Sequence, residues 1–225
     1  MGVTAGQLSR VEPRAFPDAD RFDFFVGRHL RNHKQGDGFT WYSGLGRDRV
    51  NFSRVIEEVA GFLEGENVRF ALAEAFALHA YGLSRATSDL DFVTEARVRE
   101  RLVTFLESLG YETLYSSPGY SNHLHPKTEL GRVDLIYVDG ETARRLFESP
   151  GASLHLGGHD LRVPRAEHLA AMKVHAMRND PGRALQEMAD IRFLLQLDGV
   201  DETEIREYFE KAGLRERFNE IKRSI

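Results

Sequence analysis

Apolar residues recur every three or four positions from residue 52 onward, which predicts a helix that glycines loosen near residue 65. The pattern then changes to a strand-like apolar run at 68–73, a short helix at 75–81 and a connecting turn at 82–88 that leads into a second strand. The apolar positions that predict the first helix are Phe52, Val55, Ile56, Val59, Phe62 and Leu63.

The second half of the pattern alternates again between helix and strand before it becomes wholly helical. Thr94 can cap a helix that Gly110 ends, and strands are predicted at 111–116 and 132–138. Residues 154–156 and 161–163 form a predicted hairpin over two glycines. After Pro164, apolar stripes predict helices at 165–178, 183–197, 201–211 and 213–223.

This order of elements predicts an α+β fold, in which a small mixed β-sheet flanked by helices is followed by a C-terminal helical lobe. We expect one domain with appendages: an irregular N-terminal arm at 1–50, a core at 51–163 and the lobe at 164–225. The arm has neither a sustained helical period nor strand alternation, yet its five Phe and one Trp predict that part of it folds back onto the body.

Composition narrows the class of protein. The chain is 41% hydrophobic and 29% charged, which is ordinary for a soluble globular protein, and no apolar run approaches the length of a membrane span. It has no Cys, so disulfides and thiolate metal sites are excluded, and we expect a cytoplasmic protein with no membrane partner. The net charge of -5 argues against a large surface that coats nucleic acid.

Two carboxylates in the predicted second strand are the first candidate for chemistry. Asp89 and Asp91 are separated by one apolar residue, so both side chains point to the same face while Leu90 and Phe92 point to the other. Like charges this close repel unless a divalent metal neutralises them, which indicates a magnesium site. The same spacing at Asp18-Ala-Asp20 lies in a polar segment, and two solvated edge-strand carboxylates are the structural alternative.

A third carboxylate, Asp134, lies in the apolar strand predicted at 132–138. Phosphoryl and nucleotidyl transfer use paired metal ions that carboxylates commonly share, so Asp89, Asp91 and Asp134 together predict such a site. The alternative for Asp134 is a lone acidic residue at a strand end.

These motifs resemble the polymerase-beta-type nucleotidyltransferase superfamily over about residues 52 to 197, and within it the AbiEii-like nucleotidyltransferases of abortive-infection toxin-antitoxin systems. The run from Pro164 to Lys173 resembles the second signature of that branch, and Glu187 with Asp190 resembles the acidic pair on its next helix. The matching positions around the paired carboxylates are Gly82, Arg85, Thr87, Asp89, Asp91 and Asp134.

The resemblance implies a minimal nucleotidyltransferase fold that uses Mg²⁺ (or Mn²⁺) to move a nucleoside monophosphate from an NTP to a hydroxyl. It implies that Asp89 and Asp91 bind both metals, that Asp134 ligates the catalytic metal and helps to deprotonate the acceptor, and that Lys173 contacts the triphosphate. It also places Arg85 and Thr87 in the nucleotide-binding region. The structural alternative for Lys173 is a surface side chain whose ammonium reaches solvent.

One position departs from the family pattern. Where the family has Gly-Gly or Gly-Ser between the first strand and helix, so that backbone N-H groups can approach the triphosphate, this chain has Glu74-Ala75. A Glu there would place bulk and negative charge where phosphates lie. Glu74 could instead turn outward, ligate another metal, or mark a relative that keeps the fold without the activity.

Several histidines and one further acidic residue are weaker candidates. His123 and His125, with His155 and His159, could hold a transition metal, but the surrounding residues favour a polar loop. Packing is the default role of His168 and His175, a satisfied and partly buried state is favoured for His79, and a structural salt bridge is favoured for Asp190.

The function predicted from the sequence is nucleotidyl transfer, with a toxin of a toxin-antitoxin pair as one setting and an antitoxin protein as its partner. The acceptor is left open between a tRNA end, a protein hydroxyl and a small molecule such as an aminoglycoside. The main alternative is a catalytically silent protein with the same fold that binds nucleotide, nucleic acid or protein, and Glu74 favours it. A metal-dependent hydrolase that uses the same carboxylates is a third possibility.

Overall fold

The computed structural model describes residues 50–225, so the predicted arm, except for its last residue, and the Asp18-Ala-Asp20 pair lie outside the described residues. The centre of the described part is a five-stranded mixed sheet with the strand order β1-β2-β5-β4-β3. β2 and β5 run parallel, and the other neighbours are antiparallel. The strands are β1 Phe70–Leu72, β2 Asp89–Glu95, β3 Glu112–Ser116, β4 Tyr120–Leu124 and β5 Arg132–Val138.

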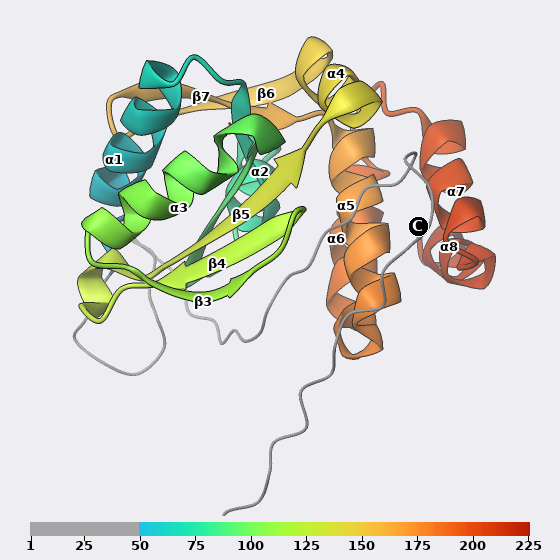
Figure 1. Ribbon diagram of the computed structural model, residues 1–225. Helices are drawn as coiled ribbons and strands as arrows, with labels where there is room; N and C mark the ends of the chain where they lie inside the picture. Colours follow the sequence, from blue (N-terminus) through green and yellow to red (C-terminus); the bar gives the residue numbers. More distant parts are fainter. Residues whose placement is uncertain (1–49) are drawn as a thin grey trace, which may run out of the picture.

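Two helices, α1 (Phe52–Gly65) and α3 (Arg99–Ser108), lie next to each other on the left of the sheet in Figure 1. The Phe62 and Phe105 rings join them by stacking with centroids 4.3 Å apart. The predicted apolar stripe of the first helix is confirmed, because all of its positions except the half-buried Phe62 are buried. Asn51 begins α1 by accepting a hydrogen bond from the Arg54 backbone N-H.

A two-stranded antiparallel sheet follows the core, with β6 at Pro150–Leu156 and β7 at His159–Pro164. The predicted hairpin over Gly157-Gly158 is confirmed, and both glycines have positive φ. Gly157 also lies close to α1, where a Cβ atom would come within 2.6 Å of the Ser53 carbonyl oxygen, so any larger residue would force the hairpin away from the helix.

Four helices form the C-terminal lobe, which stands to the right of the sheet in Figure 1. Its core includes Ile205 and Phe209, which are fully buried, and Phe209 packs its ring against that of Phe218 at 5.5 Å. The α+β class and the helical lobe predicted from the pattern are therefore confirmed. The lobe helices are α5 Ala166–Asn179, α6 Ala184–Leu194, α7 Glu202–Lys211 and α8 Arg215–Arg223.

The structure adds one α-helix and one strand that the pattern did not predict, which are α4 (Gly140–Glu148) and β4. The interpretation of the His123 region as a polar loop is wrong, because this polar segment is a buried strand. His123 is fully buried, with its Nδ1 atom 3.1 Å from the Thr113 hydroxyl and its Nε2 atom 2.8 Å from the Ser121 hydroxyl. Such a closed network lets polar residues occupy a central strand.

The transition-metal interpretation of the histidines is also wrong for the described part of the chain. His155 pairs with Asp160, and His159 pairs with Glu64, while the ring nitrogens of His125 contact the Leu109 carbonyl and the Lys127 backbone N-H. These rings are spread over the sheet and the hairpin, and within residues 50–225 no three His, Asp or Glu side chains are gathered to hold an ion.

Candidate active site

The three candidate carboxylates lie on one face of the sheet, on two adjacent parallel strands. Asp91 of β2 is paired in register with Asp134 of β5, and Asp89 is paired with Arg132. Residues that face each other across neighbouring strands point to the same side, so the pairing places all three carboxylates on one side of the sheet. Asp134 is fully buried and Asp91 is 4% exposed, whereas Asp89 is half-buried.

Burial and mutual repulsion raise the affinity of these carboxylates for protons. Burial, followed by repulsion from Asp134, raises the pKa of Asp91 well above its ordinary value. Burial also raises the pKa of Asp134 to about 6, even though the Arg132 cation lowers it. The pKa of Asp89 is raised by burial as well. A site that resists negative charge in this way is one that a cation would stabilise.

The oxygen atoms of these three carboxylates are chemically suited to bind a hard divalent cation. Arg132 Nε donates a hydrogen bond of 2.8 Å to Asp134 Oδ1, while the buried Asp134 Oδ2 has no hydrogen-bond partner among the described residues. Carboxylate oxygens are the ligands that Mg²⁺ and Mn²⁺ prefer. As the side chains stand, no three acidic or imidazole groups in residues 50–225 are gathered closely enough to hold an ion.

The turn before β2 orders the first carboxylate. The Thr87 hydroxyl accepts a hydrogen bond from the Asp89 backbone N-H at 3.2 Å and donates one to the Asp89 carbonyl at 3.1 Å. The Ser88 hydroxyl donates to the Asp89 carboxylate. Thr87 is only 8% exposed, so its visible role is to fix the entry of the strand.

Glu74 begins α2 (Glu74–Ala80) and points into the protein. Its φ angle is 47°, in the left-handed region that glycine adopts without strain and that is strained for other residues. Its side chain is 3% exposed, and its Oε2 atom is 2.9 Å from Lys173 Nζ. The alternative that Glu74 turns outward is therefore wrong. Ala75, which follows it, is also buried.

Lys173 of α5 is the centre of a buried ion cluster. Its side chain is fully buried, and its Nζ atom lies 2.9 Å from Glu74, 3.1 Å from Glu187 and 2.8 Å from Asp190. The alternative of a surface lysine is wrong, and the salt bridge expected for Asp190 is confirmed. Lys173 thus lies among three carboxylates, and not beside Asp134. The ion cluster that they form joins α2 to the lobe.

Two arginines complete the cluster, which then has three acidic and three basic groups. Arg85 Nη1 is 2.8 Å from Asp190 and Arg85 Nη2 is 3.7 Å from Glu74, while Arg183 Nη2 is 2.5 Å from Glu187. Although burial alone would raise it, the pKa of Glu74 is lowered to about 2 by the nearby Lys173 and the two arginines. Such a neutral cluster is costly to disturb at any single member.

Arg183 is a candidate residue that the sequence did not indicate. Its positive charge lowers the pKa of Asp89 and of Asp91, although burial raises both more strongly, and its buried Nη1 atom has no hydrogen-bond partner among the described residues. Arg183 follows Asp180-Pro-Gly, which is a turn signal, so the sequence indicates a loop there and gives no sign of a functional side chain. Arg132 was missed for a different reason. It is the first residue of the predicted strand at 132–138, and the strand pattern does not show that its side chain pairs with that of Asp134.

The remaining histidines match the expectation of packing or partial burial. The His79 Nδ1 atom is 2.9 Å from the Ser84 hydroxyl, and the ring is half-buried. His168 is buried, and His175 contacts the side chain of Asn179 at 2.8 Å. In the described part of the chain, no helix is long and apolar enough to cross a bilayer.

Comparison with known proteins finds similarity in structure only. No family model and no curated protein matches the chain. The solution structure of the antibiotic-resistance factor ANT(2'')-Ia is 12% identical, with a TM-score of 0.56 over 77% of this chain and 96% of that one. The crystal structure of ANT(2'')-Ia in complex with adenylyl-2''-tobramycin is 13% identical, with a TM-score of 0.54 over 75% and 99%. The chain therefore has a nucleotidyltransferase fold.

Proposed function

We propose that this protein is a metal-dependent nucleotidyltransferase that moves a nucleoside monophosphate from an NTP to a hydroxyl acceptor. The observation that carries the proposal is the pairing of Asp91 with Asp134 across β2 and β5, with Asp89 on the same face and the Asp134 Oδ2 atom unpartnered. A row of buried carboxylates that repel one another is poorly explained by stability alone, because each uncompensated charge opposes folding.

In the proposed reaction, the acceptor oxygen attacks the α-phosphorus, and the bond from that phosphorus to the oxygen bridging to the β-phosphate breaks. Pyrophosphate leaves with the bonding pair, and the acceptor proton moves to Asp134 Oδ2. A carboxylate whose pKa is about 6 is suited to accept a proton near neutral pH. A divalent cation, Mg²⁺ or Mn²⁺, would be held by Asp89, Asp91 and Asp134 and would neutralise the phosphate charge when bound.

The other candidate residues have supporting roles in this proposal. Arg132 holds Asp134 in place through Oδ1, so that Oδ2 faces the acceptor. Arg85 and Arg183 supply positive charge near the carboxylates, where the triphosphate would lie. Lys173 and Glu74 act through the buried ion cluster by holding the start of α2 against α5, and Ala75 and Thr87 shape the adjoining turns.

A toxin of a toxin-antitoxin pair in the cytoplasm, with an antitoxin protein as partner, is the biological setting that we propose from the AbiEii-like resemblance. The ANT(2'')-Ia neighbour that carries adenylyl-2''-tobramycin supports a small-molecule hydroxyl as the acceptor. The organisation into a core at 51–163 and a lobe at 164–225 also remains a proposal.

A catalytically silent binding protein is the second candidate, and Glu74 is the observation that favours it. Its carboxylate already neutralises Lys173, the residue that the resemblance assigns to the triphosphate. Under this candidate the fold would bind nucleotide or a protein partner without turnover.

The test is transfer of label from each of the four α-labelled NTPs, with Mg²⁺ or Mn²⁺, to total RNA, total protein and a panel of hydroxylated small molecules. We expect transfer by the parent, a loss of at least about 100-fold in Asp134→Asn, and no loss in the matched control Asp160→Asn, whose side chain is 89% exposed. A folded parent that transfers no label but binds an NTP would support the silent candidate and overturn the enzyme.

A further inference from the structure

The row of carboxylates continues across the sheet into two strands that the proposed chemistry does not use. Asn122 of β4 is the register partner of Asp134, and Tyr115 of β3 is the partner of Asn122. One face therefore presents Asp91, Asp134, Asn122 and Tyr115 side by side across four strands. This face is opposite to the one on which His123 contacts Thr113 beneath α3, since neighbouring strand residues alternate sides.

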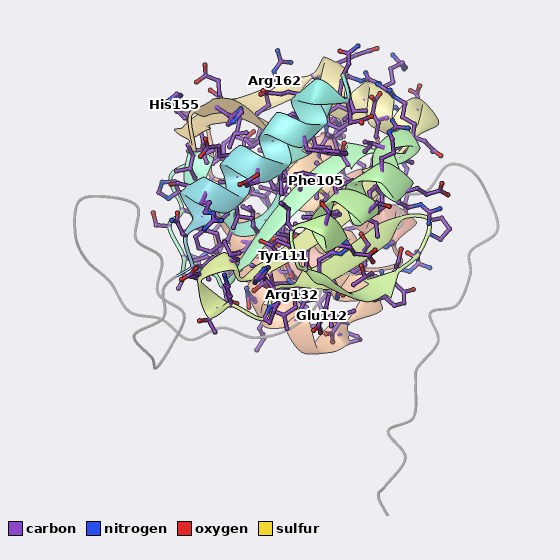
Figure 2. The ribbon with its side chains drawn as sticks, turned by 60° about the vertical axis from the view of Figure 1, so that its left-hand side comes forward. Phe105, Tyr111, Glu112, Arg132, His155 and Arg162 are labelled. Carbon is purple, nitrogen blue, oxygen red and sulfur yellow. The ribbon has the colours of Figure 1, made fainter. Side chains whose placement is uncertain are left out.

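A second row runs parallel to the first on the same face. Arg132 of β5 is paired with Leu124 of β4, and Leu124 is paired with Glu112 of β3. Arg132 and Glu112 lie at the same end of the sheet in Figure 2. We call the surface made by Glu112, Tyr115, Asn122 and Leu124 the β3-β4 platform.

The platform combines apolar area with an unsatisfied polar atom. Leu124 is 42% exposed and Tyr115 is 37% exposed, and both are among the few large apolar side chains that are exposed in residues 50–225. The Asn122 Oδ1 atom is buried and has no hydrogen-bond partner among the described residues. A buried acceptor atom without a partner is destabilising, so its retention beside Asp134 indicates a ligand that donates a hydrogen bond there.

Charge selects the class of ligand. The platform contributes the exposed carboxylate of Glu112, and the half-buried Asp89 lies in the same row, while Arg132 and Asp134 form an ion pair at 2.8 Å that cancels both of their charges. The exposed carboxylate of Glu112 at the outer edge of the platform would attract a ligand with amino groups. The exposed ring and leucine side chain fit the apolar face of a ring-containing molecule, and the Asn122 oxygen fits its hydroxyl or ammonium donors.

We propose that the β3-β4 platform is the acceptor subsite and that the acceptor is a small polyhydroxylated molecule that carries amino groups. This inference rests on the proposed function, because it assigns the side from which a hydroxyl reaches Asp134. Asn122 would orient the acceptor next to the carboxylate that takes its proton, and Glu112 would hold an amino group at the outer edge of the sheet.

The test measures binding directly, so that it does not depend on turnover. Tobramycin, lincomycin and glucosamine are titrated by calorimetry into the full-length protein and its variants, total tRNA is the polyanionic competitor, and an α,β-methylene NTP analogue reports the nucleotide site. We expect at least one of the three amine-bearing polyols to bind, and both Asn122→Ala and Glu112→Gln to weaken it at least about fivefold. Binding of the NTP analogue should stay within about twofold of the parent in both variants.

Glu100→Gln is the matched control, since this α3 carboxylate is 89% exposed and lies away from the platform. If Asn122→Ala does not fold, Glu112→Gln at the exposed strand edge still decides the question. Binding of no polyol, binding that both platform variants leave unchanged, or tighter binding of tRNA at the same face would each overturn the inference. A polyol that binds here without any label transfer would support the subsite and refute the proposed enzyme, which separates the two failures.

Discussion

The replacement Lys173→Met removes the central cation of the buried ion cluster while it keeps most of the side-chain volume. The ammonium of Lys173 lies within 3.1 Å of carboxylates from Glu74, Glu187 and Asp190, and it is fully buried. In the variant, three buried carboxylates would be left with Arg85 and Arg183 as their remaining cations. Water cannot solvate the surplus charge, so the cost is borne by the folded state.

We expect Lys173→Met to lower the free energy of unfolding by about 3–5 kcal/mol near pH 7, the range for breaking a buried ion pair by removing one partner. This is a large part of the roughly 5–15 kcal/mol by which folded proteins are usually stable. For comparison, we expect at most about 0.5 kcal/mol from Lys211→Met, because Lys211 is 70% exposed and pairs with Glu207 on the surface of α7.

The pH dependence gives the loss a second signature. The pKa of Glu74 is lowered to about 2 in the folded protein from an ordinary value of 4.5, so its pairing stabilises the fold above about pH 4.5 and this stabilisation disappears as the pH falls toward 2. Lys173 is the largest of the positive charges that lower this pKa, so its removal weakens the lowering. The difference between the parent and Lys173→Met should therefore be largest above about pH 5 and shrink as the pH falls.

Urea unfolding followed by circular dichroism, at about pH 7 and about pH 4, measures both effects. Lys211→Met is measured beside Lys173→Met as the control for removing a lysine charge from the surface. A Lys173→Met protein within about 1 kcal/mol of the parent near pH 7 would refute the argument, as would a deficit that grows on acidification.

Three further outcomes test other parts of the structure. Asp91→Asn should stabilise the metal-free protein by roughly 1–2 kcal/mol, because it removes a buried charge that Asp134 repels. Thermal unfolding with EDTA and with Mg²⁺ should show that the ion stabilises the parent more than the variant. An equal effect on both proteins would argue against Asp91 as a ligand. Glu74→Gly should be more stable than Glu74→Ala by about 1–2 kcal/mol in urea unfolding, since both lose the ion pair and only Gly accepts a φ of 47° without strain; equal stabilities would contradict the strain. Phe209→Ala should cost about 3–5 kcal/mol in the same assay, because the ring is fully buried in the lobe, and a cost below about 1 kcal/mol would mean that the lobe core is loosely packed.

The buried ion cluster also connects α2 and the turn after it to the C-terminal helices. Glu74 and Arg85 precede β2 in the chain, whereas Lys173 lies on α5 and Glu187 and Asp190 lie on α6, and the ion pairs join the two groups. Because separated halves would each retain unpaired buried charges, the lobe and the start of α2 hold each other in place.

Elements with local signals could be predicted from the residue pattern alone. Helical periodicity identified α1 and the lobe helices, because each needs one apolar stripe, and the apolar runs around Asp89, Asp91 and Asp134 identified the strands that carry the candidate carboxylates. Alternation along a strand also placed Asp89 and Asp91 on one face, since this depends only on the two-residue repeat of the backbone. The strand β4 was not predicted, because its buried polar residues are of the kind usually found in loops.

Which distant side chains contact one another could not be predicted from the residue pattern. Glu74 and Lys173 are 99 residues apart, and the direction of the Glu74 side chain follows from its left-handed backbone and from an ion pair formed after α5 has packed. The neighbours of Asp134 likewise depend on strand register, which sets Asp91 on one side and Asn122 on the other. Pairing between distant strands and charges is fixed by packing and by the need to satisfy buried groups, and no local pattern contains that information.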